Sequence, residues 1–312
     1  MITEQQIQLV KQTVPLLQQA GETLTRHFYD IMLSEYAQVR PLFNQANQAS
    51  GDQPRALANA VINYGRFIDR LEQITGVVQQ IVHKHVALQI LPEHYPIVGT
   101  CLLRAIREVL GAHVATDEVI AAWAVAYQKL ADILIAAEEE VYRANQAARG
   151  GWRGARAFVV RRKEHESSEI CSFYLYPRDG EPVLQHQCGQ YLGLRLLVDG
   201  QEVRRNYSIS NSPDAVHYRI SVKREPGGVV SNYLHDQVNE GTELDVFAPA
   251  GEFVLRESDK PLALITAGVG ITPALAMVEA ARHSGREIHF IHCARHGGVH
   301  AFRKWIEMQA RQ

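Results

Sequence analysis

The stretch QQIVHKHVALQILPEHYPIVG, residues 79–99, contains three histidines, and histidine is the most common metal-ligating side chain. If its first half is helical, His85 shares a face with Ile81 and Leu88, whereas His83 points to nearly the opposite side. His83 and His85 therefore cannot chelate one ion from a regular helix, and we expect His83 and His94 to face outward. His85 is the candidate ligand, although a lone histidine on an apolar face is more often a packed core residue.

A carboxylate far along the chain is the second candidate. Glu138 falls one turn after Leu134 on the apolar stripe of a helix that we expect to begin at Asp117. A carboxylate on a buried stripe needs a partner. The alternative is an edge position in a solvated EEE run, because Glu139 and Glu140 can face water.

Two glycine-containing loops have the composition of phosphate sites. In VKREPGGVVSNYLH, residues 222–235, the residues Gly228, Val230 and Ser231 lead into a helix N-terminus, where backbone N–H groups attract phosphate. In TAGVGITP, residues 266–273, Gly268 and Gly270 lie between a buried strand and a helix and allow close approach of a pyrophosphate. A G-x-G pattern alone is weak support.

Composition limits the kinds of protein that this chain can be. Hydrophobic residues make up 46% and charged residues 21% of its 312 residues, as in globular proteins. A net charge of -2 without a basic run argues against nucleic acid as a partner. The 4 cysteines form no C-x-x-C pair, which favours a reducing compartment, and we expect a cytoplasmic protein. No apolar run approaches about 20 residues, so we expect no membrane span.

The elements that must position these residues fall into three successive types. Residues 1–147 show 3.6-residue periodicity and predict an all-α domain that ends at Gly150 and Gly151. Residues 151–257 consist of short β-rich segments and turn dipeptides, which indicate an antiparallel β-barrel. Residues 258–312 read strand, helix, strand, helix, the start of an α/β nucleotide-binding domain. Such domains normally have about five or six parallel strands, so we expect this one to be incomplete.

Five motifs in the first domain resemble a bacterial globin: HFYD (27–30), RPLFN (40–44), GDQPRAL (51–57), KHVALQI (84–90) and EHYPIVG (93–99). The resemblance implies heme b with His85 as the proximal iron ligand and Phe43 against the heme. It places Tyr29, Gln53 and Leu57 over the open iron face, where the hydroxyl and the carboxamide can donate hydrogen bonds to O2. The alternative is that Tyr29 is a core aromatic residue and Gln53 an exposed cap.

The same resemblance gives the carboxylate a function. In bacterial globins fused to reductases, residues matching Glu138 and Tyr95 form a hydrogen-bonded network with the proximal histidine. Such a network makes His85 more imidazolate-like and favours redox chemistry over oxygen carriage. Lys84 matches a family lysine near heme and flavin, although a lysine on a helix surface is usually just solvated.

The second half resembles the ferredoxin-reductase family. RRNYSIS, residues 204–210, matches its flavin motif, which implies that Arg205 pairs with the FAD pyrophosphate, Tyr207 packs on the isoalloxazine and Ser208 bonds near the reactive nitrogen. The other implied FAD contacts are Tyr191 in GQYLG, Asn206, Gly228, Val230 and Ser231. The pattern G-x-G-x-T-P marks the NAD(P)H site of that family, here Gly268, Val269, Gly270, Ile271, Thr272 and Pro273.

Across all 312 residues the chain resembles a flavohemoglobin. The resemblance implies a nitric oxide dioxygenase in which NAD(P)H reduces FAD, FAD reduces heme, and O2 and NO become nitrate. We expect a monomer. One alternative is a heme protein that senses or buffers O2 or NO, which the absence of the family's Cys-Gly-Pro segment and terminal aromatic residue favours. Another is a flavin reductase that works without heme.

Overall fold

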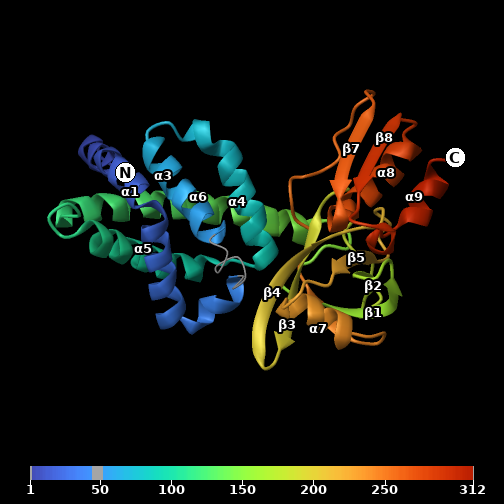
Figure 1. Ribbon diagram of the computed structural model, residues 1–312. Coiled ribbons are helices and arrows are strands. Elements are labelled where there is room, and N and C mark those ends of the chain that lie inside the picture. The colour runs from blue at the N-terminus through green and yellow to red at the C-terminus, as the bar shows by residue number, and fades with distance from the viewer. Residues whose placement is uncertain (1, 44–51, 312) are drawn as a thin grey trace. The chain divides into compact units, whose positions relative to one another are not determined.

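Helices form the first part of the chain (Figure 1). The structure is a computed structural model that describes residues 2–43 and 52–311, and the side chains of residues 52–58 lie outside this description. The α-helices are α1 (Glu4–Glu35), α3 (Asp52–Arg66), α4 (Thr75–Leu88), α5 (Tyr95–Leu110) and α6 (Asp117–Ala147), with short 3-10 helices at Ala37–Leu42, Leu71–Ile74 and Pro92–His94.

Close backbone approach fixes α5 against α6. A Cβ atom at Gly99 of α5 would lie 2.5 Å from the ring of Tyr127 on α6, so only glycine lets the two helices come this close. The Tyr127 hydroxyl donates to the carbonyl oxygen of Tyr95 at 2.7 Å. These contacts hold the start of α5 beside α6, the helix that carries Glu138.

Helix α6 is a core helix of this part of the chain. By length and composition alone it is apolar enough to cross a membrane, with a mean hydropathy of 1.5 over its most apolar window. Trp123 and Ala126 on α6 are buried in the core, and the Trp123 indole donates to the Thr13 hydroxyl of α1 at 2.8 Å. A buried core helix passes the same composition test, so this signal is weak.

An antiparallel sheet of six strands follows, in the order β4-β3-β6-β1-β2-β5. After β4, Ile209 forms a bridge to Ile220 of β5, so the two edge strands meet and the sheet curls towards a barrel, as predicted. Its interior holds Phe158, Phe173 and Leu194. The strands are β1 (Arg156–His165), β2 (Ile170–Pro177), β3 (Tyr191–Val198), β4 (Gln201–Ser208), β5 (Tyr218–Lys223) and β6 (Glu243–Val246).

Helix α7 (Val229–Asp236) precedes β6 and is fixed at its C-terminal end. The Lys163 ammonium group donates to the carbonyl oxygens of His235 and Val238, both at 2.6 Å. A cation at this end of a helix also interacts favourably with the helix dipole. The C-terminal end of α7 is thereby held against β1.

The last part of the chain is a two-stranded parallel sheet, β7 (Leu262–Ala267) and β8 (Ile288–Cys293). The helices α8 (Thr272–His283) and α9 (Arg303–Gln309) lie with it in the same region of Figure 1. One face of the sheet packs Leu264 against Ala276 and Met277 of α8. On the other face Ile265 and Ile291 are 77% and 55% exposed. The order of all-α, antiparallel β and α/β parts is the predicted one.

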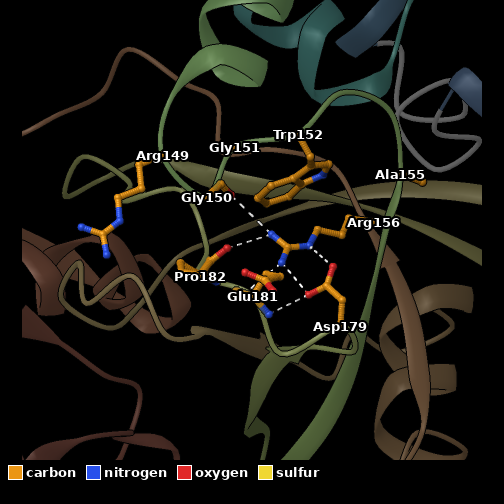
Figure 2. A pocket seen from close by; sticks show the side chains of 9 residues that line it. All are labelled: Arg149, Gly150, Gly151, Trp152, Ala155, Arg156, Asp179, Glu181 and Pro182. Atoms are coloured by element: carbon orange, nitrogen blue, oxygen red, sulfur yellow. Dashed lines mark hydrogen bonds and ion pairs between the residues drawn. The ribbon is translucent and has the colours of Figure 1, made fainter.

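The segment between α6 and β1 is anchored by Arg156, which Figure 2 shows among the residues lining a pocket of about 580 Å³. Its guanidinium group forms a two-point ion pair with Asp179, at 3.0 and 2.7 Å. Its remaining N–H bonds reach the carbonyl oxygens of Gly150, Glu181 and Pro182. All five donors of Arg156 are thus used by the protein itself. The described chain forms two compact units, Met1–Val141 and Tyr142–Gln312.

Candidate functional site

Three predicted residues from three helices meet in the first unit. His85 Nδ1 lies 2.7 Å from Glu138 Oε1 and 3.1 Å from the Tyr95 hydroxyl. The Tyr95 hydroxyl donates to the same Glu138 oxygen at 2.6 Å. Glu138 is 2% exposed and Tyr95 is 7% exposed. A buried carboxylate therefore has two hydrogen-bond donors, which is the condition under which its burial is tolerated.

The pattern of donors assigns the tautomer of His85. The Tyr95 hydroxyl gives its only proton to Glu138, so the contact between His85 Nδ1 and Glu138 needs a proton on Nδ1. A neutral imidazole with Nδ1 protonated has a lone pair on Nε2, the form that ligates iron. The site therefore fits a heme held by a single histidine. Among the described residues no group of three or more His, Cys, Asp or Glu side chains could hold a metal ion.

Local chain geometry explains where His85 stands. It lies in the last turn of α4, which ends at Gln89 in the left-handed conformation with φ 55°. The next short helix begins after Leu91 and leads directly into α5, so Tyr95 comes back beside His85.

We expected His83 and His94 to face outward, and the structure places both at half-buried positions. The Nδ1 atom of His94 accepts a hydrogen bond from the Leu91 backbone N–H at 2.9 Å. His94, the last residue of the short helix Pro92–His94, therefore satisfies the backbone N–H of the N-cap residue Leu91.

Of the other predicted heme-pocket residues, Tyr29 and Phe43 pack against each other. Tyr29 is 5% exposed, and its ring packs edge-on against Phe43 with ring centroids 5.5 Å apart. Burial raises the pKa of the Tyr29 hydroxyl, so this group keeps its proton as a donor. Lys84 is exposed on α4. The side chains of Gln53 and Leu57, on α3, lie outside the described residues.

The predicted flavin residues gather on β3, β4 and their surroundings. Arg205 is half-buried, and its Nη1 donates to the Arg204 carbonyl oxygen at 2.7 Å. Desolvation lowers the pKa of Arg205, and no carboxylate pairs with it among the described side chains. A partly desolvated guanidinium group of this kind fits an anion such as a pyrophosphate.

The two predicted aromatic contacts lie on neighbouring strands. Tyr191 of β3 is half-buried. Its ring packs so closely on Gly251 that a Cβ atom at Gly251 would lie 2.7 Å from Tyr191 Cε1. Tyr207 of β4 is half-buried and packs against the barrel interior, and burial raises the pKa of its hydroxyl. Ser208 is half-buried and Asn206 is exposed on the same strand.

The N-terminus of α7, which follows β5, is the other predicted phosphate site for FAD. Gly228 is the N-cap residue, and no side chain caps the first turn. The Ser231 hydroxyl accepts from the Glu225 N–H at 3.1 Å, which closes the loop before the helix. Val230 and Ser231 are buried, and the backbone N–H groups of a helix N-terminus attract phosphate.

The predicted nucleotide loop has the expected strand, loop and helix context. Gly268–Ile271 forms a short 3-10 helix between β7 and α8, and Gly268 has φ 52°. A Cβ atom on Gly268 or Gly270 would meet nothing within 4 Å, so the loop borders open space. Thr272 closes it by donating to the Val269 carbonyl oxygen at 3.0 Å, and Pro273 stands in the first turn of α8. Ile271 is buried.

Two polar groups were missed by sequence reasoning. The first is the Arg156 anchor, whose pocket is lined by none of the predicted site residues. The second is a buried row of serines, Ser172, Ser221 and Ser210, on the barrel. Ser172 on β2 and Ser221 on β5 each look like an ordinary solvent-facing strand residue. Only Ser210, the last residue of RRNYSIS, lies beside a predicted site residue in sequence.

Fold and site together define a globin joined to a flavin-dependent reductase. The family model described as Globin matches residues 26–134, and the model described as Oxidoreductase FAD-binding domain matches residues 157–255. A flavohemoprotein of Pseudomonas aeruginosa is 67% identical over 307 residues, which are 98% of this chain and 78% of that protein. The chain belongs to the flavohemoprotein family.

Solved structures agree with this assignment. The structure of a flavohemoglobin from Malassezia yamatoensis with bound FAD and heme matches with a TM-score of 0.87 at 25% identity, covering 99% of this chain and 82% of that one. The FAD/NAD binding domain of a nitric oxide dioxygenase from Vibrio cholerae matches with a TM-score of 0.50 at 37% identity, covering 51% of this chain and 71% of that one.

Proposed function

We propose that the chain converts NO and O2 to nitrate at a heme iron that NAD(P)H reduces through FAD. The observation that carries the proposal is the buried Glu138 carboxylate, 2.7 Å from His85 Nδ1. A globin that only stores oxygen does not need a charged partner on its proximal histidine, whereas oxygen activation gains from a more electron-rich ligand. The solved relatives named above support both cofactors and the reaction.

When bound, heme supplies the iron that binds O2 and oxidises NO, and FAD turns the two electrons of a hydride into single electrons. His85 Nε2 is the ligand that this chain offers to the iron. Glu138 accepts a hydrogen bond from the Nδ1–H group of His85, which fixes the orientation of the ring and makes Nε2 a more electron-rich ligand. Tyr95 holds the Glu138 carboxylate in position through the bond at 2.6 Å.

The Tyr29 hydroxyl would donate a hydrogen bond to a diatomic ligand on the heme, and the family resemblance assigns the same role to the Gln53 carboxamide. The buried Tyr29 hydroxyl stays protonated at neutral pH, because desolvation raises its pKa. Phe43 would pack against the heme, and the family resemblance assigns Leu57 to the same pocket and Lys84 to the heme edge.

In the second unit, Arg205 and the N-terminus of α7 at Gly228, Val230 and Ser231 hold the FAD phosphates. Tyr191 and Tyr207 pack on flat rings of FAD, with Ser208 and Asn206 as polar contacts. The residues Gly268 to Pro273 hold the pyrophosphate of NAD(P)H.

We further infer three domains, residues 1–147, 151–257 and 258–312, from the change in sequence pattern. A cytoplasmic monomer without nucleic acid partners fits the net charge of -2 and the unpaired cysteines.

The decisive test is aerobic NO consumption by the chain loaded with heme and FAD, with NADH or NADPH and separately with a chemical reductant. We expect nitrate to form in proportion to NO consumed. Nitrate formation with the chemical reductant alone would assign the reaction to the globin part and deny the electron route from NAD(P)H. NO loss no faster than in buffer under both conditions would refute the dioxygenase and favour a sensor or buffer of O2 or NO.

A further inference from the structure

Two histidine rings stack on each other at the end of strand β8. The ring centroids of His292 and His300 are 4.8 Å apart, and the ring planes are inclined by 32°. His292 Nδ1 lies 2.7 Å from the Thr266 hydroxyl oxygen of β7, which is the only side-chain hydrogen bond of the pair among the described residues. His300 Nε2 is buried and has no hydrogen-bond partner there. The protein itself therefore holds His300 by stacking alone and leaves His292 Nε2 available to another molecule.

The pair lies at the end of the sheet where a nucleotide is expected. Thr266 and His292 are register partners in the parallel strands β7 and β8. The predicted nucleotide loop begins two residues after Thr266, at Gly268. In sheets of this kind, ligands bind in the crevice outside the carboxyl ends of the strands. If the loop after β7 holds the pyrophosphate, then His292 stands at the end of the next strand along the crevice.

The residue at the end of this second strand selects the nucleotide in dinucleotide-binding folds. NAD-binding proteins place an Asp or Glu there, about 20 residues after the glycine loop, where it bonds the ribose 2′-hydroxyl; a nearby arginine accommodates the 2′-phosphate of NADP. His292 follows Gly270 at about this spacing. Residues 288–300 contain four histidines, one arginine and no Asp or Glu. The stretch thus lacks the carboxylate that would repel a 2′-phosphate and has cationic groups in its place.

The charges around the pair leave it without a carboxylate of its own. Burial lowers the pKa of His292, and the charge of His300 lowers it further. His300 also acts on Glu307 of α9, but the pKa of Glu307 is lowered mainly by its ion pair with Arg303 at 2.8 Å, and Arg311 adds to this. Two protonated rings this close repel each other, so the pair takes up both protons only when an anion compensates the charge.

We propose that His292 and His300 hold the 2′-phosphate of NADPH, so that this chain accepts NADPH as its reductant. The inference deepens the proposed function, on which it rests, by naming which nicotinamide dinucleotide the site selects. A protonated His292 donates Nδ1–H to the Thr266 hydroxyl and Nε2–H to a phosphate oxygen. The stacked His300 ring adds a second positive charge. Binding of the phosphate dianion raises the pKa of both rings, so the affinity falls as the pH rises above the histidine range.

The test measures two probes on the whole chain loaded with heme and FAD. The probes 2′,5′-ADP and 5′-AMP differ only in the 2′-phosphate, and isothermal titration calorimetry gives the affinity of each. At pH 6.5, 2′,5′-ADP should bind about 10- to 100-fold more tightly than 5′-AMP, as expected for one charge-assisted bond to phosphate. At pH 8.5 this ratio of affinities should be about 10-fold smaller, because the histidines are then neutral. Since FAD fills its own site, the probes report on the NAD(P)H site.

Three variants separate charge from shape. His292→Gln keeps a hydrogen-bond donor and removes the titrating charge, so the ratio should fall and no longer depend on pH. His300→Phe keeps a stacked ring without charge and should lower the ratio by about 5-fold at pH 6.5. His289→Gln is the matched control and should keep the wild-type ratio, because His289 lies on the opposite, exposed face of β8 and pairs with Glu287 at 3.2 Å.

Proton uptake is a readout that a merely structural role would not change. Calorimetry in two buffers of different ionisation enthalpy counts the protons that enter the protein when 2′,5′-ADP binds. At pH 7 we expect about one proton in the wild-type chain and in His289→Gln. In His292→Gln the uptake should be clearly smaller. If His292→Gln does not fold, His300→Phe and the pH dependence of the wild-type ratio decide.

Equal affinities of the two probes at pH 6.5 would overturn the proposal. So would a wild-type ratio in His292→Gln at both pH values, or an equal loss in His289→Gln. Neither probe contains nicotinamide, so these measurements involve neither hydride transfer nor NO. Failure of the 2′-phosphate site is therefore distinct from failure of the dioxygenase, which the NO assay alone decides.

Discussion

Replacing Glu138 by glutamine preserves the shape of the side chain and removes its charge. In the native chain one Glu138 oxygen accepts from His85 at 2.7 Å and from Tyr95 at 2.6 Å. The Glu138 side chain is 3% exposed, so water screens these bonds little. The amide oxygen of glutamine can still accept both donors, and the change therefore isolates the effect of the charge.

The size of the effect follows from the difference between charged and neutral hydrogen bonds. Bonds to a charged group contribute about 1.5–3 kcal/mol and neutral ones about 0.5–1.5 kcal/mol, so the ferric state should lose about 1–2 kcal/mol relative to the ferrous state. For a one-electron couple this raises the heme reduction potential by about 40–90 mV. NO dioxygenation should fall by about 10- to 100-fold, as for other changes behind a metal-ligating histidine.

The assay combines a potentiometric titration of the heme with resonance Raman spectroscopy of the ferrous iron–histidine bond, whose stretching frequency should fall. The control is Glu140→Gln, the same change of charge on the exposed side of α6. If the potential and the iron–histidine frequency of Glu138→Gln equal those of Glu140→Gln, then Glu138 does not tune the iron and the reasoning is refuted.

Three other predictions concern the second unit. Arg205→Ala should weaken FAD binding by about 10- to 100-fold, because a charge-assisted bond to phosphate is lost; unchanged flavin affinity in a fluorescence titration would exclude Arg205 from the site. Gly268→Ala places a side chain at φ 52° and should cost about 1–2 kcal/mol of NAD(P)H binding, seen as a higher KM with normal FAD content. His186 is 4% exposed, and burial lowers its pKa from 6.5 to about 4. Because the unfolded chain takes up the proton first, the second unit should lose about 3 kcal/mol of stability as pH falls from about 6.5 to 4. His186→Gln should flatten this part of the curve in chemical unfolding, and an unchanged slope would contradict the assignment.

Local sequence patterns were sufficient to predict the helices and strands. They were also sufficient to single out residues whose chemistry conflicts with their position. Glu138 could be singled out because a carboxylate interrupts an apolar stripe, and His85 because it shares a face with apolar residues. The contact between His85 and Glu138 could not be predicted from hydrophobic periodicity, because 53 residues separate them in sequence and the contact depends on how α4 and α6 pack. It was the family resemblance that paired them.

The buried serines Ser172 and Ser221 show what local sequence patterns could not predict. Ser172 and Ser221 have the pattern of a strand with one polar face, which normally meets water. Here Ile271 and Leu275, about a hundred residues from Ser172 and further along the chain than the barrel, cover that face. A strand whose polar face is covered by a segment further along the chain has the same alternating pattern as a strand whose polar face meets water. The same holds for Arg156, whose acceptors are mostly backbone carbonyl groups that any sequence would supply.

The anchored segment between α6 and β1 has a consequence for proteases. Arg149 and Arg153 are exposed and are the residues after which trypsin cuts. A protease needs several residues of extended, mobile backbone, yet the Gly150 carbonyl is bound by Arg156, and the Gly151 N–H donates to Ala148 at 2.9 Å. We expect limited trypsin digestion to cut after Arg149 slowly, and rapid cleavage there in the native chain would contradict the anchoring. Arg156→Ala should open the segment to the enzyme, because the ion pair with Asp179 and the bond to the Gly150 carbonyl group are lost. By this reasoning, the native contacts of Arg156 should protect the chain between the globin part and the reductase part from cleavage.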